Sequence, residues 1–82
     1  MPLEDKQARL RIMREISKYD MDTSLMRVRV INSVVYIDGR VSPMRTPSAP
    51  EDLRKVFDKL EETFLMMSDI NDVVIDVAFD RT

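Results

Sequence analysis

The chain has 82 residues, of which 44% are hydrophobic and 34% charged, and its net charge is −2. This length predicts a single domain, residues 1–82, and the composition is typical of a folded chain. The sequence contains no cysteine, no histidine and one glycine, Gly39. It therefore excludes disulfides, thiolate zinc sites, Ser-His triads and glycine-rich phosphate loops. We expect no enzymatic activity, no cofactor and no bound metal.

Charge is distributed unevenly along the chain. Residues 1–45 carry nine basic and six acidic side chains, whereas residues 46–82 carry four and nine. This division is typical either of a dipolar surface that docks or self-associates, or of two oppositely charged solvated faces. An isoelectric point near 5.0 argues against nucleic acid as a partner. No stretch approaches the roughly 18 apolar residues that a transmembrane segment requires.

Residues 4–19 are predicted to form the first helix, because Ile12, Met13, Ile16 and Tyr19 recur at helical spacing. Its other faces are basic. One interpretation is a core helix with a solvated basic face. The other is an amphipathic helix that contacts an anionic membrane surface. The basic candidates for that contact are Arg9, Arg11 and Arg14.

Residues 25–31 and 34–41 alternate apolar and polar side chains and predict a β-hairpin closed by Asn32-Ser33. A two-residue turn at this point fixes the register, so that paired residue numbers sum to 65. The predicted pairs are Val30–Val35 and Val28–Ile37 on the inward face, and Arg29–Tyr36 and Arg27–Asp38 on the outward face. The outward pairs should form a cation–π contact and an ion pair.

Residues 42–50 contain three prolines and are predicted to form an irregular loop in which Met44 and Arg45 are exposed. A second helix is expected over residues 49–67, started by a capping box of Ser48 and Glu51. Its apolar stripe consists of Leu53, Val56, Phe57, Leu60, Phe64 and Met67. The stripe predicts that this helix packs against the same core as the first one.

Residues 73–79 alternate again and predict a half-buried third strand, preceded by a turn at residues 69–72. The element order αββαβ predicts an α+β fold, a two-layer sandwich with both helices on one face of a three-stranded mixed sheet. Charge favours the strand order 2-1-3. In that order Arg27 and Arg29 would lie between Asp38 and Asp76, the acids of the two neighbouring strands.

Residues 28–41 resemble the hairpin signature of BON domains, which are bacterial modules. The signature combines an alternating strand, a tight turn and a hydrophobic strand that ends in a glycine followed two positions later by an apolar residue; Gly39 and Val41 occupy these positions. Residues 68–77 resemble the family's last turn and strand, so the resemblance covers about residues 5–79. The element order is also similar to that of ring-building modules of secretion systems.

The BON resemblance implies a non-catalytic binding module that attaches to phospholipid, to a membrane surface or to a small ligand. The alternative is a protein–protein assembly module that self-associates weakly or docks a partner through a sheet edge or a charged face. The candidate binding residues are Arg9, Arg11, Arg14, Arg27, Arg29, Tyr36, Met44 and Arg45. We expect a cytoplasmic protein if the chain is complete, and a periplasmic or envelope-associated one if a signal segment or parent chain has been removed.

Overall fold

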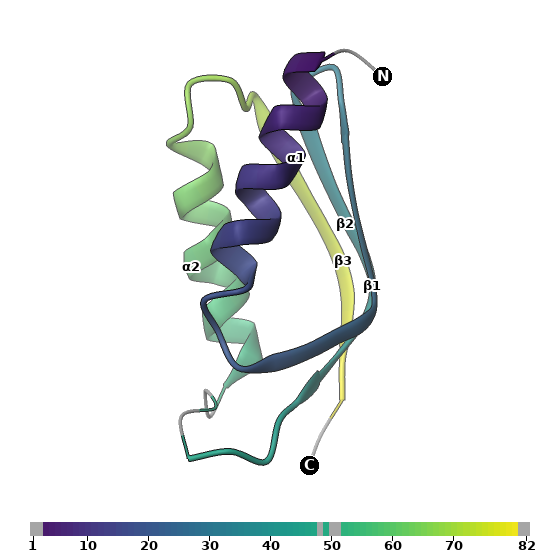
Figure 1. Ribbon diagram of the computed structural model, residues 1–82, viewed down its shortest axis with the longest axis vertical. Helices are drawn as coiled ribbons and strands as arrows, with labels where there is room; N and C mark the ends of the chain where they lie inside the picture. Colours follow the sequence, from purple (N-terminus) through teal and green to yellow (C-terminus); the bar gives the residue numbers. More distant parts are fainter. Residues whose placement is uncertain (1–2, 48, 50–51, 81–82) are drawn as a thin grey trace.

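The computed structural model of the protein describes residues 3–47, 49 and 52–80. Its elements follow the predicted αββαβ order. They are α1 (Leu3–Ile16), β1 (Met21–Ile31), β2 (Val34–Pro43), α2 (Leu53–Leu65) and β3 (Asp72–Phe79). Both helices lie on one face of the sheet (Figure 1). The α+β class and the two layers are therefore confirmed.

The core lies between the two layers. The predicted stripe of α2 is confirmed, because five of its apolar side chains are buried. From α1, Ala8, Ile12 and Ile16 are buried in the core. Met67, which follows the end of α2, is partly buried and packs at the margin of the core. The exception is Met13, which is predicted on the core stripe but is 38% exposed. The helix turns it away from the sheet, because it follows Ile12 directly and the two side chains point about 100° apart.

The hairpin register agrees most closely with the sequence pattern. All four predicted pairs occur in the antiparallel pairing of β1 with β2. Asn32 and Ser33 have positive φ angles of 51° and 65°, the backbone signature of a type I′ turn. This turn matches the twist of the two strands and therefore holds the register that the alternation predicts.

The predicted strand order 2-1-3 is wrong, because the observed order is β1-β2-β3. β2 lies in the centre, antiparallel to β1 and parallel to β3. The strands β2 and β3 are linked by α2, and a strand–helix–strand unit commonly places its two parallel strands side by side. Exposed cross-strand charge pairs contribute only about 0.2–1 kcal/mol each, too little to override this connection. The edge strands are consequently β1 and β3.

Several predicted element boundaries also differ. The first helix ends at Ile16 rather than at residue 19, and β1 begins at Met21, four residues earlier than expected. The pairing shifts between Asp22 and Leu25, so the first part of β1 lacks the regular alternation that predicts a strand. β2 extends through Pro43, inside the segment predicted to be irregular. A proline is tolerated there because the pairing of β2 with β3 ends at Val41, so Pro43 lies at an end of the strand that has no β3 neighbour.

The second helix begins at Leu53 rather than at residue 49. Asp52 is its N-cap, with its carboxylate accepting a hydrogen bond of 3.0 Å from the Arg54 N–H. Aspartate is among the strongest N-cap residues, which explains a start at this position. The predicted capping-box residues Ser48 and Glu51 lie outside the described residues.

Gly39 is required at its position on β2. Its φ angle is +105°, and a Cβ added there would lie 2.2 Å from the main-chain oxygen of Leu25. No side chain can occupy that space without moving the backbone of β1. The glycine therefore permits close approach of the two strands next to the register shift in β1.

Candidate functional site

The face of the sheet opposite the helices is open, and the two registers arrange its side chains in cross-strand rows. The rows run from β1 through β2 to β3 as Ile31–Val34–Asp72, Arg29–Tyr36–Val74, Arg27–Asp38–Asp76 and Leu25–Arg40–Ala78. We call these twelve residues the open face. Among the described residues, both helices pack on the other side of the sheet (Figure 1).

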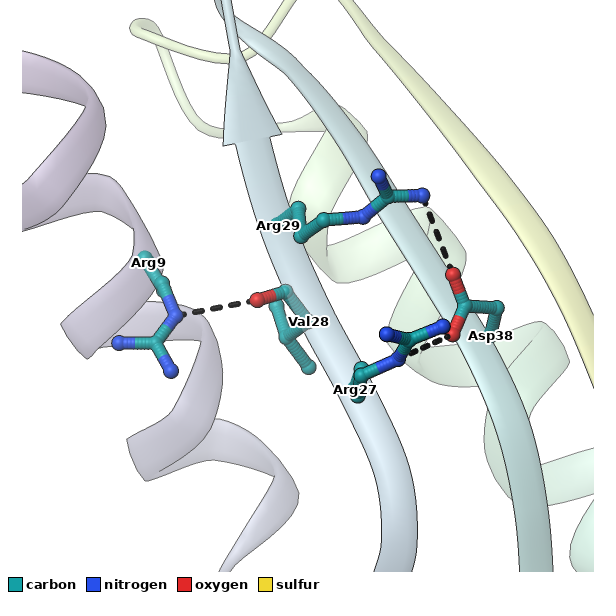
Figure 2. A network of polar contacts seen from close by, with 5 residues as sticks. All are labelled: Arg9, Arg27, Val28, Arg29 and Asp38. Atoms are coloured by element: carbon teal, nitrogen blue, oxygen red, sulfur yellow. Dashed lines mark hydrogen bonds and ion pairs between the residues drawn. The ribbon is translucent and has the colours of Figure 1, made fainter. Parts of the chain in front are cut away.

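An acid in the middle strand connects the basic residues of the open face. Arg27 Nε lies 3.2 Å from Asp38 Oδ1, and Arg29 Nη2 lies 3.1 Å from Asp38 Oδ2 (Figure 2). The Arg29 guanidinium also lies 5.8 Å from the centre of the Tyr36 ring. Both outward contacts predicted from the register are therefore confirmed. Because one carboxylate serves two guanidiniums, the pairing leaves this group of side chains with a net positive charge.

The opposite edge of the open face is acidic. β3 places Asp72 and Asp76 outward, and Asp76 is the direct pairing partner of Asp38 in the parallel register. Within the described part of the chain, the Asp76 carboxylate has no ion pair. Two carboxylates in one row repel each other, and only Asp38 is offset by arginines. The face thus carries positive charge along β1 and negative charge along β3.

An apolar strip lies near the turn end of the open face. Ile31 is 48% exposed and Val74 is 44% exposed, while Val34 and Tyr36 between them are half-buried. The strip crosses all three strands, because Ile31 pairs with Val34 and Tyr36 pairs with Val74. These four side chains form a small apolar strip on an otherwise charged face.

The candidate arginines of α1 lie on the helical layer and therefore do not join the open face. Arg9 Nε donates a hydrogen bond of 3.0 Å to the main-chain oxygen of Val28 (Figure 2). Arg11 forms an ion pair with Asp69, in the loop between α2 and β3. Arg9 is therefore bound towards β1 and Arg11 towards the loop after α2. Arg14 is exposed, and its side chain makes no ion pair with any residue that the structure describes.

The two candidates in the loop after β2, Met44 and Arg45, are exposed. Met44 is 43% exposed. Met44 contributes to a pocket of about 300 Å³ beside the end of α1, which it lines together with Met13, Ile16, Ser17, Tyr19, Asp20, Met21 and Thr23. None of the residues that line this pocket belongs to the open face, which contains Arg27, Arg29 and Tyr36. The eight predicted binding residues therefore lie on at least two separate surfaces.

Sequence reasoning missed two features of the open face. Ile31, at the end of β1, was not predicted as an outward contact residue. Asp76 was expected beside an arginine strand but lies beside Asp38. The alternation of residues 25–31 could have indicated Ile31, because it shares its face with Arg27 and Arg29. The position of Asp76 depends on strand order, for which the sequence contained no decisive signal.

The described residues contain no group of three or more His, Cys, Asp or Glu side chains placed to hold a metal ion. None of the described helices has the length and apolar character needed to cross a membrane. Comparisons with protein-family models, curated proteins and solved structures find no significant match. The function of the chain is therefore inferred from its own residues and their geometry.

Proposed function

We propose that the protein is a non-catalytic binding module that self-associates through the open face of its sheet. The observation that carries this proposal is the charge division of that face. Basic side chains follow β1, acidic side chains follow β3, and an apolar strip crosses between them. A surface with this arrangement is complementary to a second copy of itself.

A two-fold axis parallel to β2 brings two such faces together productively. This rotation places β1 of one copy over β3 of the other, and β2 over β2. Arg27 then faces Asp76 of the second copy, because both residues belong to the same cross-strand row. The outward β2 side chains Tyr36, Asp38 and Arg40 each meet their own copy near the axis. Asp38 and Arg40 are already offset within the chain, by the arginines of β1 and by Asp80. Each Asp76 carboxylate thereby gains a cationic neighbour, which the described residues of its own chain do not supply.

The size of the face predicts a transient association. Three strands at about 4.8 Å spacing and eight residues at about 3.3 Å each cover roughly 380 Å² per copy. The two copies would bury roughly 760 Å² together, well below the roughly 1,200 Å² of stable complexes. We therefore expect a dissociation constant of roughly 0.1–1 mM.

The BON resemblance also implies attachment to phospholipid, and the bonds of the arginines make that function the weaker candidate. Arg9, Arg27 and Arg29 are engaged within the chain, and Arg11 is paired with Asp69. Headgroup binding would have to recruit arginines from both layers of the molecule, whereas the two-fold contact needs only Arg27, which shares the single Asp38 carboxylate with Arg29. Electrostatic attachment to a membrane gains about 1 kcal/mol per basic residue near the surface, so several free cations on one surface are needed.

Sedimentation velocity over a wide range of protein concentrations tests the proposal. The average mass of the wild-type protein should rise with concentration, and high salt should reduce the rise. Tyr36→Lys places two ammonium groups at the two-fold axis and should abolish the rise. The matched control is Met66→Lys, since Met66 is 86% exposed at the end of α2. This control should associate like the wild-type protein.

Two results would overturn self-association through the open face. The first is a monomeric wild-type protein at every concentration. The second is equal association of the Tyr36→Lys and Met66→Lys variants. Co-sedimentation with vesicles of anionic phospholipid, but not with vesicles of neutral phospholipid, would favour the phospholipid function if it accompanied a monomeric protein.

A further inference from the structure

We propose that the free edge of β3 binds an extended segment of a partner protein in which basic residues alternate with apolar ones. The segment would add a fourth strand to the sheet, by main-chain hydrogen bonding. Strand addition is distinct from self-association in its main-chain hydrogen bonds, which lie at the edge of the sheet, whereas the Asp76 carboxylate of the open face contributes to both.

The two free edges of the sheet differ in accessibility. On β1, Arg9 of α1 donates to the main-chain oxygen of Val28, which lies on the edge away from β2 (Figure 2). β1 also contains the register shift between Asp22 and Leu25. A bulge and a covering side chain are common protections against strand addition. The β1 edge is therefore the protected one.

Among the described residues, neither protection is present on β3 from Val74 to Ala78, and the Arg54 side chain of α2 reaches only the Phe79 ring at the end of the strand. The register of β3 to β2 is unbroken from Asp72 to Phe79, and the strand contains no proline. The Asp80 N–H donates to the Val41 oxygen at 2.9 Å, and the ladder of a parallel pair repeats every second residue. The N–H groups of Ile75 and Val77 therefore point to the free edge. At Val73 the equivalent N–H donates instead to the Asp72 carboxylate, at 2.8 Å.

Charge identifies the kind of strand that fits this edge. On the same open face, Asp38 of the central strand receives two guanidiniums from the neighbouring strand β1. Asp76 occupies the same row and has no cationic partner among the described residues. A fourth strand with a basic residue in that row would form an ion pair with Asp76, as Arg27 of β1 does with Asp38.

The inner face of β3 specifies the alternate positions. Ile75, Val77 and Phe79 are only partly buried and pack at the margin of the core. Phe79 contacts the Phe57 ring of α2, with ring centres 5.3 Å apart. Apolar side chains on the inner face of a fourth strand would cover these residues. The added strand therefore needs basic residues on the open face and apolar residues on the inner face, and these alternate along its sequence.

Another copy of β3 suits this edge poorly, because its own outward residues include Asp72 and Asp76. Like charges on neighbouring strands are destabilising. The β1 edge of a second copy is covered by Arg9. These two observations favour a different protein as the source of the strand.

A synthetic peptide with the sequence of residues 25–31, blocked at both ends, is a suitable probe because it alternates arginine with apolar residues. Its binding is followed by amide chemical shifts of the full-length protein. We expect shifts concentrated on β3 around Ile75 and Val77. Shifts confined to the open face of β1 and β2, or to the helices, would overturn the proposal.

Two modifications test the mechanism. N-methylation of the peptide at its odd positions and at its even positions blocks opposite edges of the added strand. One set should abolish binding and the other should preserve it, since only one edge faces β3. Equal effects of both sets would contradict strand addition. This comparison leaves the protein unchanged, so loss of folding cannot produce the result.

Charge reversal supplies the second test. Asp76→Lys should weaken binding of the arginine peptide about fivefold or more and strengthen binding of a peptide with glutamate at both arginine positions. Asp58→Lys, on the exposed face of α2, is the matched control and should change neither. Tyr36→Lys, which disrupts self-association, should still bind the peptide. If it does not, the edge and the open face are not separate sites and the inference fails.

Discussion

The carboxylate of Asp5 accepts a hydrogen bond of 3.1 Å from the main-chain N–H of Asn32, joining the first turn of α1 to the tip of the β1–β2 hairpin. Its other oxygen accepts from the Ser33 N–H at 3.3 Å. Asp5 is 5% exposed, so it is held almost out of solvent by this arrangement. Both donors belong to the turn residues with positive φ. One buried side chain thus fixes the turn that sets the register of the open face.

This relationship predicts a large effect for a small change. Asp5→Ala leaves two turn N–H groups without an acceptor and should lower the free energy of unfolding by about 2–3 kcal/mol. Urea denaturation measures the difference. Asp58→Ala, at an exposed position of α2, should change it by less than about 0.5 kcal/mol. Equal effects of the two substitutions would show that Asp5 does not stabilise the turn.

The turn itself contains removable strain. Ser33 adopts a φ of 65°, a conformation that glycine reaches without steric cost. Ser33→Gly creates the Asn-Gly pair preferred in type I′ turns and should raise the melting temperature, with a gain of about 0.5–1 kcal/mol. Ser42→Gly, in an extended part of β2, is the control and should be destabilising. A lower melting temperature for Ser33→Gly would show that the serine is not strained in this turn.

The opposite substitution at Gly39 should be severe. Gly39→Ala adds a Cβ at a φ of +105° and within 2.2 Å of the Leu25 oxygen. We expect a loss of about 2 kcal/mol or more in unfolding free energy, because both the backbone conformation and the strand contact must change. Chemical denaturation gives the value, and Arg40→Ala on the same strand should cost less than about 1 kcal/mol. A tolerated Gly39→Ala would mean that β1 relaxes freely at its register shift.

Asp22, in the irregular start of β1, provides a pH-dependent prediction. The pKa of Asp22 lies below its ordinary value of 3.8, because the Ser24 N–H donates to its carboxylate and the Ser24 hydroxyl adds a second bond. A lowered folded-state pKa stabilises the fold above pH 3.8, and this contribution disappears as the pH falls through the folded pKa. Carboxyl NMR titration should therefore show a low pKa that rises part of the way towards normal in Ser24→Ala. An unchanged pKa in that variant would exclude a role for the hydroxyl.

Local rules predicted the helices, the hairpin and its register, because each depends on spacing within a few residues. Val28, Val30, Val35 and Ile37 define one face, and Asn32 permits the turn between the strands. The predicted start of α2 is wrong because the prediction relied on a capping box of Ser48 and Glu51, whereas the helix is capped by Asp52. Nothing in residue spacing distinguishes such neighbouring caps.

Strand order could not be predicted because it depends on how the two hairpin strands compete for β3. The exposed charges of Arg27, Arg29 and Asp76 favour the wrong order, and such charges contribute little to stability. The partners of the candidate site residues could not be predicted either. Arg9 and Arg11 look free in the sequence, but the fold gives them a main-chain oxygen and Asp69 as partners. Such partners are distant in sequence and become visible only when the elements are assembled.

Self-association as proposed brings two copies together through their open faces, with β1 of one over β3 of the other. The chain has no cysteine, so Ala78→Cys on β3 accepts a single spin label. Spin-labelled protein is mixed with ¹⁵N-labelled wild-type protein, and the relaxation of the wild-type amides is measured. We expect the strongest broadening on β1 around Leu25, the residue in the row of Ala78. Broadening centred on α1 or α2, or no broadening at concentrations where the average mass has risen, would contradict this arrangement.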